Sequence, residues 1–424
     1  MNREEYDFYL GILKKELVPA LGCTEPIAIA FASAKAREIL GEFPKSMQVL
    51  CSGNIIKNVK GVTVPNSGGL VGISAAAILG AAGGDSSREL EVLSTVTQED
   101  IDQTKNLLKT DFCSCRLQEN VDNLYVDVLV SSDEHSAEVV VSGRHTQIVR
   151  MTVDGKQTFA MDETASEDET NSTPISIRKI LEFAESVKTE DLEDTIGLQI
   201  KYNRAISDYG LANDIGAKVG KTILETNPND IHARAKARAA AGSDARMAGC
   251  PLPVVIISGS GNQGITASMP VLEYAEMLGC SGETTTRALV ISNLVAYHIK
   301  HQIGSLSAFC GAVTAACGAG AAITYLYHGS YEQICNTVIN TLMGISGMVC
   351  DGAKASCALK IATAIDNAIT AHEMSMRGIC FKPGEGLRQE DIESTVKSVA
   401  YVAREGMSGT DTVILKIMTG EIVP

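Results

Sequence analysis

Three cysteines in the last third of the chain have the residue type and the setting to hold an iron–sulfur cluster. Cys310 begins a charge-free stretch, and Cys350 and Cys357 follow it with a Cys-x39-Cys-x6-Cys spacing. Thiolates match iron and its bridging sulfides, and three thiolate ligands leave one iron open to act as a Lewis acid. The spacing alone favours three buried core thiols, which are common in a chain rich in glycine and alanine.

The surroundings of these thiols favour the cluster. Cys350-Asp351-Gly352 predicts a turn, and Cys357 would then begin a helix that continues over residues 358–371. Helix starts present free N–H groups that stabilise an anionic sulfur. Cys317 follows Cys310 by about two helical turns, so it is a competing ligand on the same helix face. If the cluster forms, the sulfurs of the three cysteines should lie within about 7 Å of one another.

Cys23 is the candidate catalytic group. It precedes Thr24-Glu25-Pro26, and Pro26 in the first turn predicts a helix through residue 40. A thiol at a helix N-terminus has a lowered pKa, so Cys23 could take the Cα proton of a substrate or act as a displaceable fourth cluster ligand. The alternative is an inert, buried thiol, in which case the base would be Lys57, Glu25 or Lys354.

Polar turns supply candidate substrate-binding residues. Asn54, Lys57, Asn66 and Ser67 lie on two turns between apolar segments, where amide, hydroxyl and ammonium groups suit an α-carboxylate. Ordinary turn chemistry would use the same residue types. Ser260 and Asn262 belong to a glycine-rich loop at 258–264 that would let backbone N–H groups approach an anion.

Four segments together resemble the L-cysteine desulfidase family, which is related to the iron–sulfur L-serine dehydratases. They are GCTEP (22–26), SGSGNQG (258–264), SAFCGAVTAACGAGAA (307–322) and SGMVCDGAKASCALKIATA (346–364). The resemblance spans essentially the whole chain. It implies a [4Fe–4S] cluster on Cys310, Cys350 and Cys357, a functional thiol at Cys23, and elimination of sulfide from L-cysteine to give pyruvate and ammonia. The CDG motif and the short gap after it differ from the serine dehydratase pattern.

Three other functions remain open at this point. An L-serine dehydratase would use the same type of cluster. A pyridoxal phosphate-dependent lyase would use the loop at 258–264 and a Schiff-base lysine, for which Lys354 or Lys360 could serve. A non-enzymatic iron–sulfur sensor would hold iron without turning over a substrate.

Charge and composition exclude several partners. The formal net charge is −15, which argues against nucleic acid and anionic membrane. The charge-free stretches at 61–84, 247–272 and 302–331 are rich in small residues and interrupted by proline or glycine, so we expect buried core rather than membrane spans. Twelve cysteines without a signal peptide indicate reduced thiols in the cytoplasm. We expect a small amino-acid substrate and a homo-oligomer, most simply a dimer.

The hydrophobic patterns predict an α+β fold. Helical spacing covers residues 4–18 and 27–40, and short strands are expected at 47–52 and 62–64. Alternation at 124–130, 137–141 and 146–153, followed by an Asp154-Gly155 turn into 156–159, predicts an antiparallel sheet. Residues 162–174 are acidic and rich in Ser and Thr, as in a linker, and from 175 onward the spacing is helical apart from a short apolar run at 254–258.

Three regions follow from these patterns. They are a mixed α/β segment at 1–84, an antiparallel β region at 85–170, and a mainly helical domain at 175–424 that holds the cluster. The chemistry requires Cys23 near the open iron. The first segment must therefore pack on the helical domain, with the GCTEP turn and the Asn66-Ser67 turn facing the loop at 350–357 across a cleft.

Overall fold

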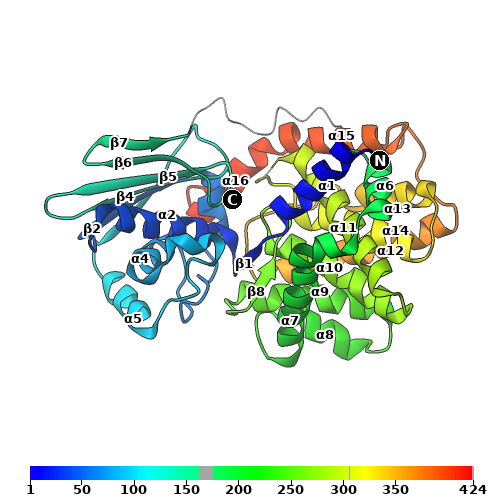
Figure 1. Cartoon of the computed structure of the whole chain (residues 1–424), viewed down its shortest axis with the longest axis horizontal. Coiled ribbons are helices and arrows are strands. Elements are labelled where there is room, and N and C mark those ends of the chain that lie inside the picture. Colours follow the sequence, from blue (N-terminus) through cyan, green and yellow to red (C-terminus); the bar gives the residue numbers. More distant parts are fainter. Residues whose placement is uncertain (162–174, 305, 423–424) are drawn as a thin grey trace.

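A computed structural model describes residues 1–161, 175–304 and 306–422. It confirms the α+β class: a six-stranded sheet covered by helices lies beside a larger assembly of helices (Figure 1). We call residues 22–161 the sheet part, and residues 175–407 together with the first helix the helical part. The predicted linker at 162–174 lies outside the described residues.

The sheet has the strand order β3-β2-β4-β5-β6-β7. All neighbouring pairs are antiparallel except β2 with β3. The predicted alternation is confirmed at β4, where Val126, Val128 and Val130 are buried. The strands are β2 (Ser46–Cys51), β3 (Cys113–Leu117), β4 (Tyr125–Ser131), β5 (Ser136–Ser142), β6 (Ile148–Val153) and β7 (Lys156–Ala160).

Two features of this part differ from the sequence patterns. Strand β3 is parallel to β2 and was not predicted, because its residues are largely exposed and show no alternation. The strand expected at 62–64 is reduced to one bridge between Thr63 and Val71. Strand β2 precedes residue 84, so the sheet draws on the first predicted region as well as on the second.

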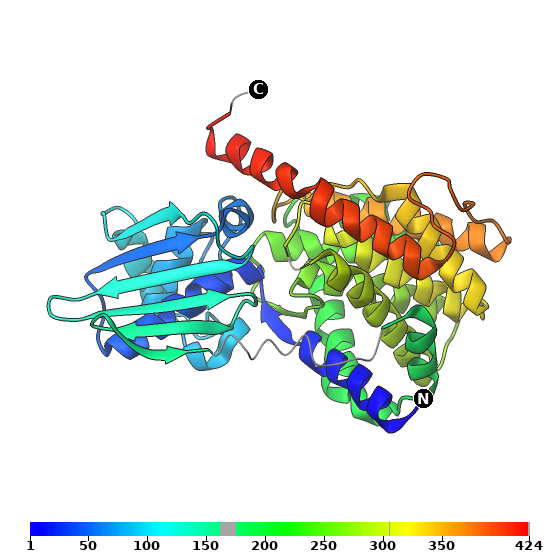
Figure 2. The same ribbon diagram turned by 90° about the horizontal axis from the view of Figure 1, so that it is seen from above.

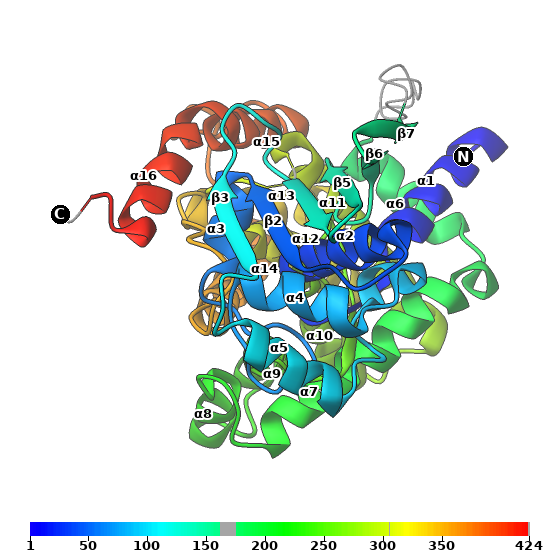
Figure 3. The same ribbon diagram turned by 90° about the vertical axis from the view of Figure 1, so that its left-hand side faces the viewer.

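Helices cover one face of the sheet (Figure 3). Helix α2 contacts both β4 and β5, and α4 packs on α2. The α2–α4 approach needs a residue without a side chain, since a Cβ on Gly80 would lie 2.3 Å from the carbonyl oxygen of Ala30. The helices of this part are α2 (Thr24–Leu40), α3 (Gly53–Val59), α4 (Ile73–Gly83), η1 (Ser86–Glu91) and α5 (Gln98–Leu107).

In the helical part, α12 (Gly311–Leu326) is buried along nearly its whole length and contacts α10, α11, α13 and α14. Its neighbours approach closely because α12 consists mainly of Gly, Ala and Thr. The other α-helices of this part are α1 (Arg3–Glu16), α6 (Ile177–Ser186), α7 (Leu198–Ala212), α8 (Val219–Thr226), α9 (Ile231–Met247), α10 (Gly261–Met277), α11 (Gly282–Ile303), α13 (Tyr331–Ile345), α14 (Cys357–Met376) and α15 (Ile392–Tyr401), and α16 (Ser408–Thr419) follows it in the chain. Short turns of helix complete it at η3 (Thr189–Leu192), η4 (Glu193–Gly197) and η5 (Val402–Gly406).

Both ends of the chain join the two parts (Figure 2). Helix α1 lies on the helical part, where Tyr9 stacks on Phe183 with ring centroids 5.5 Å apart. Strand β1 (Pro19–Leu21) then pairs antiparallel with β8 (Pro253–Val255) before the chain enters the sheet part. At the other end α16 leaves the helical part and packs against α3. The interface between the parts is therefore closed by segments from both ends of the sequence.

The helices within the described residues include none long and apolar enough to cross a membrane. The charge-free stretches are instead buried, as expected: α4, α10 and α12 contribute to one continuous apolar core. The predicted homodimer and the cytoplasmic location stay predictions.

Candidate active site

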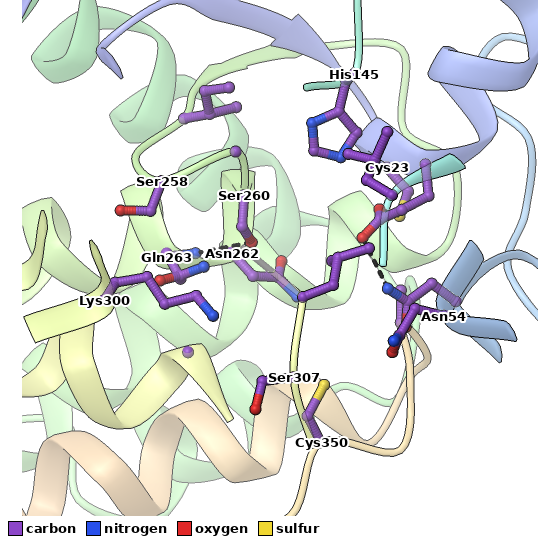
Figure 4. A pocket seen from close by; sticks show the side chains of 18 of the residues that line it. Cys23, Asn54, His145, Ser258, Ser260, Asn262, Gln263, Lys300, Ser307 and Cys350 are labelled. Carbon is purple, nitrogen blue, oxygen red and sulfur yellow. Dashed lines mark hydrogen bonds between the residues drawn. The ribbon is translucent and has the colours of Figure 1, made fainter. Parts of the chain in front are cut away.

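A cavity of about 540 Å³ lies between the two parts. A cleft at this interface is what the sequence predicts, because the proposed chemistry requires Cys23 near the three candidate cluster cysteines. In Figure 4 Cys23 and His145 lie toward one end and Cys350 and Ser307 toward the other, with Ser260 and Asn262 between them. The sheet part contributes Cys23, Glu25, Asn54, Lys57, Asn58 and His145. The helical part contributes Arg246, Ser258, Ser260, Asn262, Lys300, Cys310, Cys350, Cys357 and Lys360.

The three predicted cluster cysteines all line this cavity. Cys310 is the N-cap of α12, and Cys357 is the first residue of α14. Backbone pairing closes the long gap between the first two: the Cys310 N–H donates to Met348 O over 3.0 Å, and the Cys350 N–H donates to Ala308 O over 2.6 Å. The two thiols thereby come within hydrogen-bonding range of each other.

The pKa values of the Cys310 and Cys350 thiols shift in opposite directions. The hydrogen bond from Cys310 and the nearby charges of Lys57 and Lys300 lower the pKa of Cys350 to about 6. The same hydrogen bond, together with burial, raises the pKa of Cys310. One thiolate is thus favoured at neutral pH, and lysine charges surround it.

The donor set fits an iron–sulfur cluster better than a single ion. Among the described residues, no group of three or more His, Cys, Asp or Glu side chains gathers closely enough to bind one metal ion. Cluster thiolates bind different irons and are therefore spread around a common space. Three thiols around one cavity, two of them at helix starts, have this arrangement. The competing thiol of Cys317 is fully buried in α12 and does not line the cavity.

Cys23 forms a hydrogen-bonded pair with Glu25. The thiol donates to Glu25 Oε2 over 3.0 Å, and Asn58 Nδ2 donates to Glu25 Oε1 over 2.9 Å. Gly22 turns the chain into this site at a φ of +59°, where a Cβ would lie 2.2 Å from the Pro65 ring. The GCTEP motif therefore places a thiol and a carboxylate on the same short turn of backbone.

The expectation of a lowered pKa for Cys23 is wrong. Cys23 is the N-cap of α2, but burial and the Glu25 carboxylate raise its pKa well above the usual value. Burial also acts to raise the pKa of Glu25, but His145, the Cys23 thiol and Arg246 outweigh it and hold that pKa below the ordinary value. The pair therefore consists of a neutral thiol and an ionised carboxylate.

His145 and Arg246 are among the cavity-lining residues that the sequence patterns did not single out. His145 lies on the β5–β6 connection, its buried Nε2 has no partner among the described residues, and burial lowers its pKa. Arg246 is 3% exposed in the last turn of α9. A polar hairpin loop gave no reason to single out His145. The position of Arg246 inside an alanine-rich helix was the signal that could have identified it.

The loop at 258–264 is shaped as a tight turn followed by a helix start. Ser258 and Gly259 have φ values of +49° and +73°, and backbone hydrogen bonds of 3.0 and 3.3 Å link Ile257 to Ser260 across them. Ser260 Oγ then accepts from the Gln263 N–H at 3.4 Å and caps α10. Positive φ at a non-glycine residue is uncommon and concentrates at functional sites.

Buried polar atoms without hydrogen-bond partners cluster on this cavity. Such atoms are rare in folded proteins and indicate a missing ligand or solvent. Those among the described residues that line the cavity are Asn54 Oδ1, Asn58 Oδ1, His145 Nε2, Arg246 Nε, Ser258 Oγ and Asn262 Oδ1. Their mixture of donors and acceptors suits a small polar ligand that carries both charges.

Lysines give this cavity a cationic wall although the protein is acidic. Lys57 is buried and pairs with Asp411, and Lys360 pairs with Asp351. Lys300 Nζ donates to Gly304 O over 2.6 Å, and burial lowers the pKa of Lys300 to about 8. An anionic substrate or cluster would be stabilised here.

Asn66 and Ser67 are not among the cavity-lining residues. Asn66 Nδ2 donates to Leu93 O over 2.9 Å. Ser67 Oγ donates to Val64 O over 2.7 Å and accepts from the Leu70 N–H at 2.9 Å. Their polar groups complete the 64–70 turn, which is the ordinary turn chemistry that the same residue types also predict. Lys354 also lies outside the lining and pairs with Asp351.

Comparison with known proteins identifies one matching family and several similar proteins of similar length. The family described as "Serine dehydratase alpha chain" matches residues 87–416. A "UPF0597 protein" of Lachnoclostridium phytofermentans is 52% identical over 97% of this chain and 99% of its own. Similar proteins from Finegoldia magna and Desulfitobacterium hafniense are 48% and 45% identical, and each is covered over 99% of its length.

Proposed function

The chain belongs to the serine dehydratase alpha chain family, and from that premise we propose that it is an iron–sulfur-dependent lyase that releases sulfide from L-cysteine. Membership of this family makes the protein a lyase. The observation that supports an iron–sulfur-dependent elimination is that one cavity brings together Cys310, Cys350 and Cys357 and the Cys23–Glu25 pair, while L-cysteine as the substrate follows the resemblance of the sequence motifs. Elimination needs both the Lewis acid that the three cysteines would hold and the proton transfer that the Cys23–Glu25 pair would carry out.

Cys310, Cys350 and Cys357 would hold a [4Fe–4S] cluster, which when bound supplies an open iron that acts as a Lewis acid. The lysine charges of Lys57 and Lys300 would balance the thiolates that hold it. Helix starts at Cys310 and Cys357 add backbone N–H groups to the same end of the cavity.

The Cys23–Glu25 pair would move the Cα proton. The Cys23 thiol is neutral, so it can accept a proton only as it gives its own to Glu25, whose Oε2 is already its hydrogen-bond acceptor. The electron pair of the broken Cα–H bond forms the Cα=Cβ bond while the Cβ–S bond breaks, and the sulfur departs as hydrosulfide. The aminoacrylate becomes an imine and hydrolyses to pyruvate and ammonia.

L-Serine dehydration by the same residues is the second candidate, because the matching family carries that name. The pyridoxal phosphate alternative has less support, since Lys354 lies outside the cavity lining and Lys360 is held by Asp351 and by Val349 O. The sensor alternative gives no role to the unpartnered polar atoms at the Cys23 end of the cavity.

The test is anaerobic purification of the whole chain, analysis of iron and acid-labile sulfide, and pyruvate assays with L-cysteine and with L-serine. We expect pyruvate and sulfide from L-cysteine, with loss of activity in air and no effect of borohydride. Cluster-loaded protein that forms no pyruvate from either amino acid would overturn the proposal. Faster turnover of L-serine would assign the second candidate instead.

A further inference from the structure

Arg246 is a buried cation that forms no ion pair with any carboxylate of the described residues. Its side chain lines the cavity and the residue is 3% exposed, yet its Nε has no hydrogen-bond acceptor among the described residues. Glu25 is nonetheless near enough for the charge of Arg246 to influence it. Buried arginines normally have their donors satisfied, because an unpaired buried charge is strongly destabilising.

The surroundings hold this guanidinium in place. Arg246 lies in the last turn of α9, where the helix dipole favours a cation. The first residue of α10 packs directly on it: a Cβ on Gly261 would lie 2.5 Å from Arg246 Nε. The glycine at 261 thus lets the backbone of the 258–264 loop approach the guanidinium. A fixed, desolvated guanidinium at a cavity wall is a preorganised anion site.

The groups that line the cavity indicate which anion Arg246 would bind. A guanidinium binds a planar carboxylate through two parallel hydrogen bonds. The same cavity presents the unpartnered oxygens of Asn54 and Asn58, which can accept from an ammonium group. A cation from the helical part and two acceptors from the sheet part, facing one cavity, match the two charged groups of an α-amino acid.

We propose that Arg246 binds the α-carboxylate of the substrate and that Asn54 and Asn58 accept hydrogen bonds from its α-ammonium group. The inference deepens the proposed function, on which its substrate class rests. It makes Arg246 the residue that restricts this site to free amino acids. Compounds whose carboxylate is masked as an amide would bind more weakly.

The direct test compares the binding of L-alanine and of L-alaninamide to anaerobically purified holoprotein by calorimetry. L-Alanine has both charged groups but no leaving group, and L-alaninamide lacks the carboxylate. We expect the wild type to prefer L-alanine, and Arg246→Met to lose roughly 10- to 100-fold in L-alanine affinity while binding the amide as before. Arg246→Lys should be intermediate, since it keeps the charge but not the two-point geometry.

Thermal unfolding without ligand separates a binding role from a structural one. Because Arg246 forms no ion pair with a described carboxylate, Arg246→Met should lower the unfolding temperature by less than a variant that breaks a paired arginine on the same helix. The matched control is Arg238→Met on the same helix, which breaks an ion pair with Glu273 of 2.9 Å and should lower the unfolding temperature without changing the preference for L-alanine.

The outcomes distinguish this inference from the proposed function. Arg246→Met that retains the preference for L-alanine overturns the inference, even if the wild type turns over L-cysteine. Binding of inorganic phosphate that depends on Arg246, with no binding of L-alanine, also overturns it. The wild type could form no pyruvate and still bind L-alanine in a way that Arg246→Met abolishes. That result would overturn the proposed function and leave the inference intact.

Discussion

The thiol of Cys23 donates its hydrogen bond to Glu25 Oε2 across 3.0 Å. Cys23, which the sequence predicts to be a thiolate, is therefore the proton donor of the Cys23–Glu25 pair. Glu25 holds the negative charge because His145, Cys23 and Arg246 stabilise it against the effect of burial. The pair can pass a proton only in one order, from substrate to sulfur and from sulfur to carboxylate.

Glu25→Gln should therefore abolish most turnover while keeping the cluster. The amide can accept the thiol hydrogen bond but cannot take its proton, so we expect kcat for L-cysteine to fall by roughly 10²- to 10⁴-fold. Iron content should not change, because Glu25 is not a ligand. Glu38→Gln on the same helix, which removes an exposed ion pair with Lys35, is the control and should retain full activity. Unchanged turnover in Glu25→Gln would remove the pair from the mechanism.

The cysteines should separate into three classes by substitution to alanine. Cys23→Ala should keep its iron and lose most sulfide release, whereas Cys350→Ala should lose iron and activity together. Cys317→Ala should keep both, since Cys317 is buried in α12 away from the cavity. Iron analysis beside a sulfide assay distinguishes these outcomes. Loss of iron in Cys317→Ala would return that thiol to the ligand set.

The Lys57–Asp411 ion pair should be important for stability as well as for the site. Lys57 has 1% of its side chain exposed, so Asp411→Asn leaves a buried ammonium without its counterion. We expect a loss of about 3 kcal/mol in the free energy of unfolding, with partial recovery in the Lys57→Met, Asp411→Asn double variant. Asp133→Asn, which breaks an exposed pair with Lys45, should cost less than about 1 kcal/mol in denaturant unfolding. Equal losses in the two single variants would contradict this account.

Asp127 should make the stability of the sheet pH-dependent. Burial and Glu138 raise its pKa to about 6, against which Arg150 acts. The folded state therefore binds a proton that the unfolded state releases near pH 4, and the wild type loses stability as the pH rises from 4 to 6. The loss in the free energy of unfolding as the pH rises through both pKa values is roughly 3 kcal/mol. Relative to the wild type, Asp127→Asn should gain stability across that range in urea unfolding at several pH values. A constant difference between the two proteins would show that Asp127 does not titrate there.

Local patterns sufficed for much of the fold. The alternation at 124–130 and 137–141 corresponds to β4 and β5, and Asp154-Gly155 turns β6 into β7. Both patterns depend on residues close in sequence. Strand β3 was not predicted because an exposed edge strand has no buried face that would impose an alternation of apolar and polar residues.

The site was only partly predictable for a related reason. Cys310, Cys350 and Cys357 could be grouped because each stands at a recognisable turn or helix start. The pKa of Cys23 could not be anticipated from its helix N-terminus, because burial and the neighbouring carboxylate outweigh the helix dipole. His145 and Arg246 reach the cavity only through packing between the two parts, which no local pattern encodes.

The position of Asp411 has a consequence for how the protein is made. Asp411 lies on α16, and besides pairing with Lys57 it accepts the Ala308 N–H at 2.9 Å, two residues before Cys310. On the ribosome Lys57 emerges long before its counterion, and the segment before Cys310 gains its hydrogen bond to Asp411 only after α16 has been synthesised. A nascent chain that lacks α16 therefore also lacks both Asp411 contacts, and the proposed cluster site at Cys310 would be completed only once α16 has folded against it.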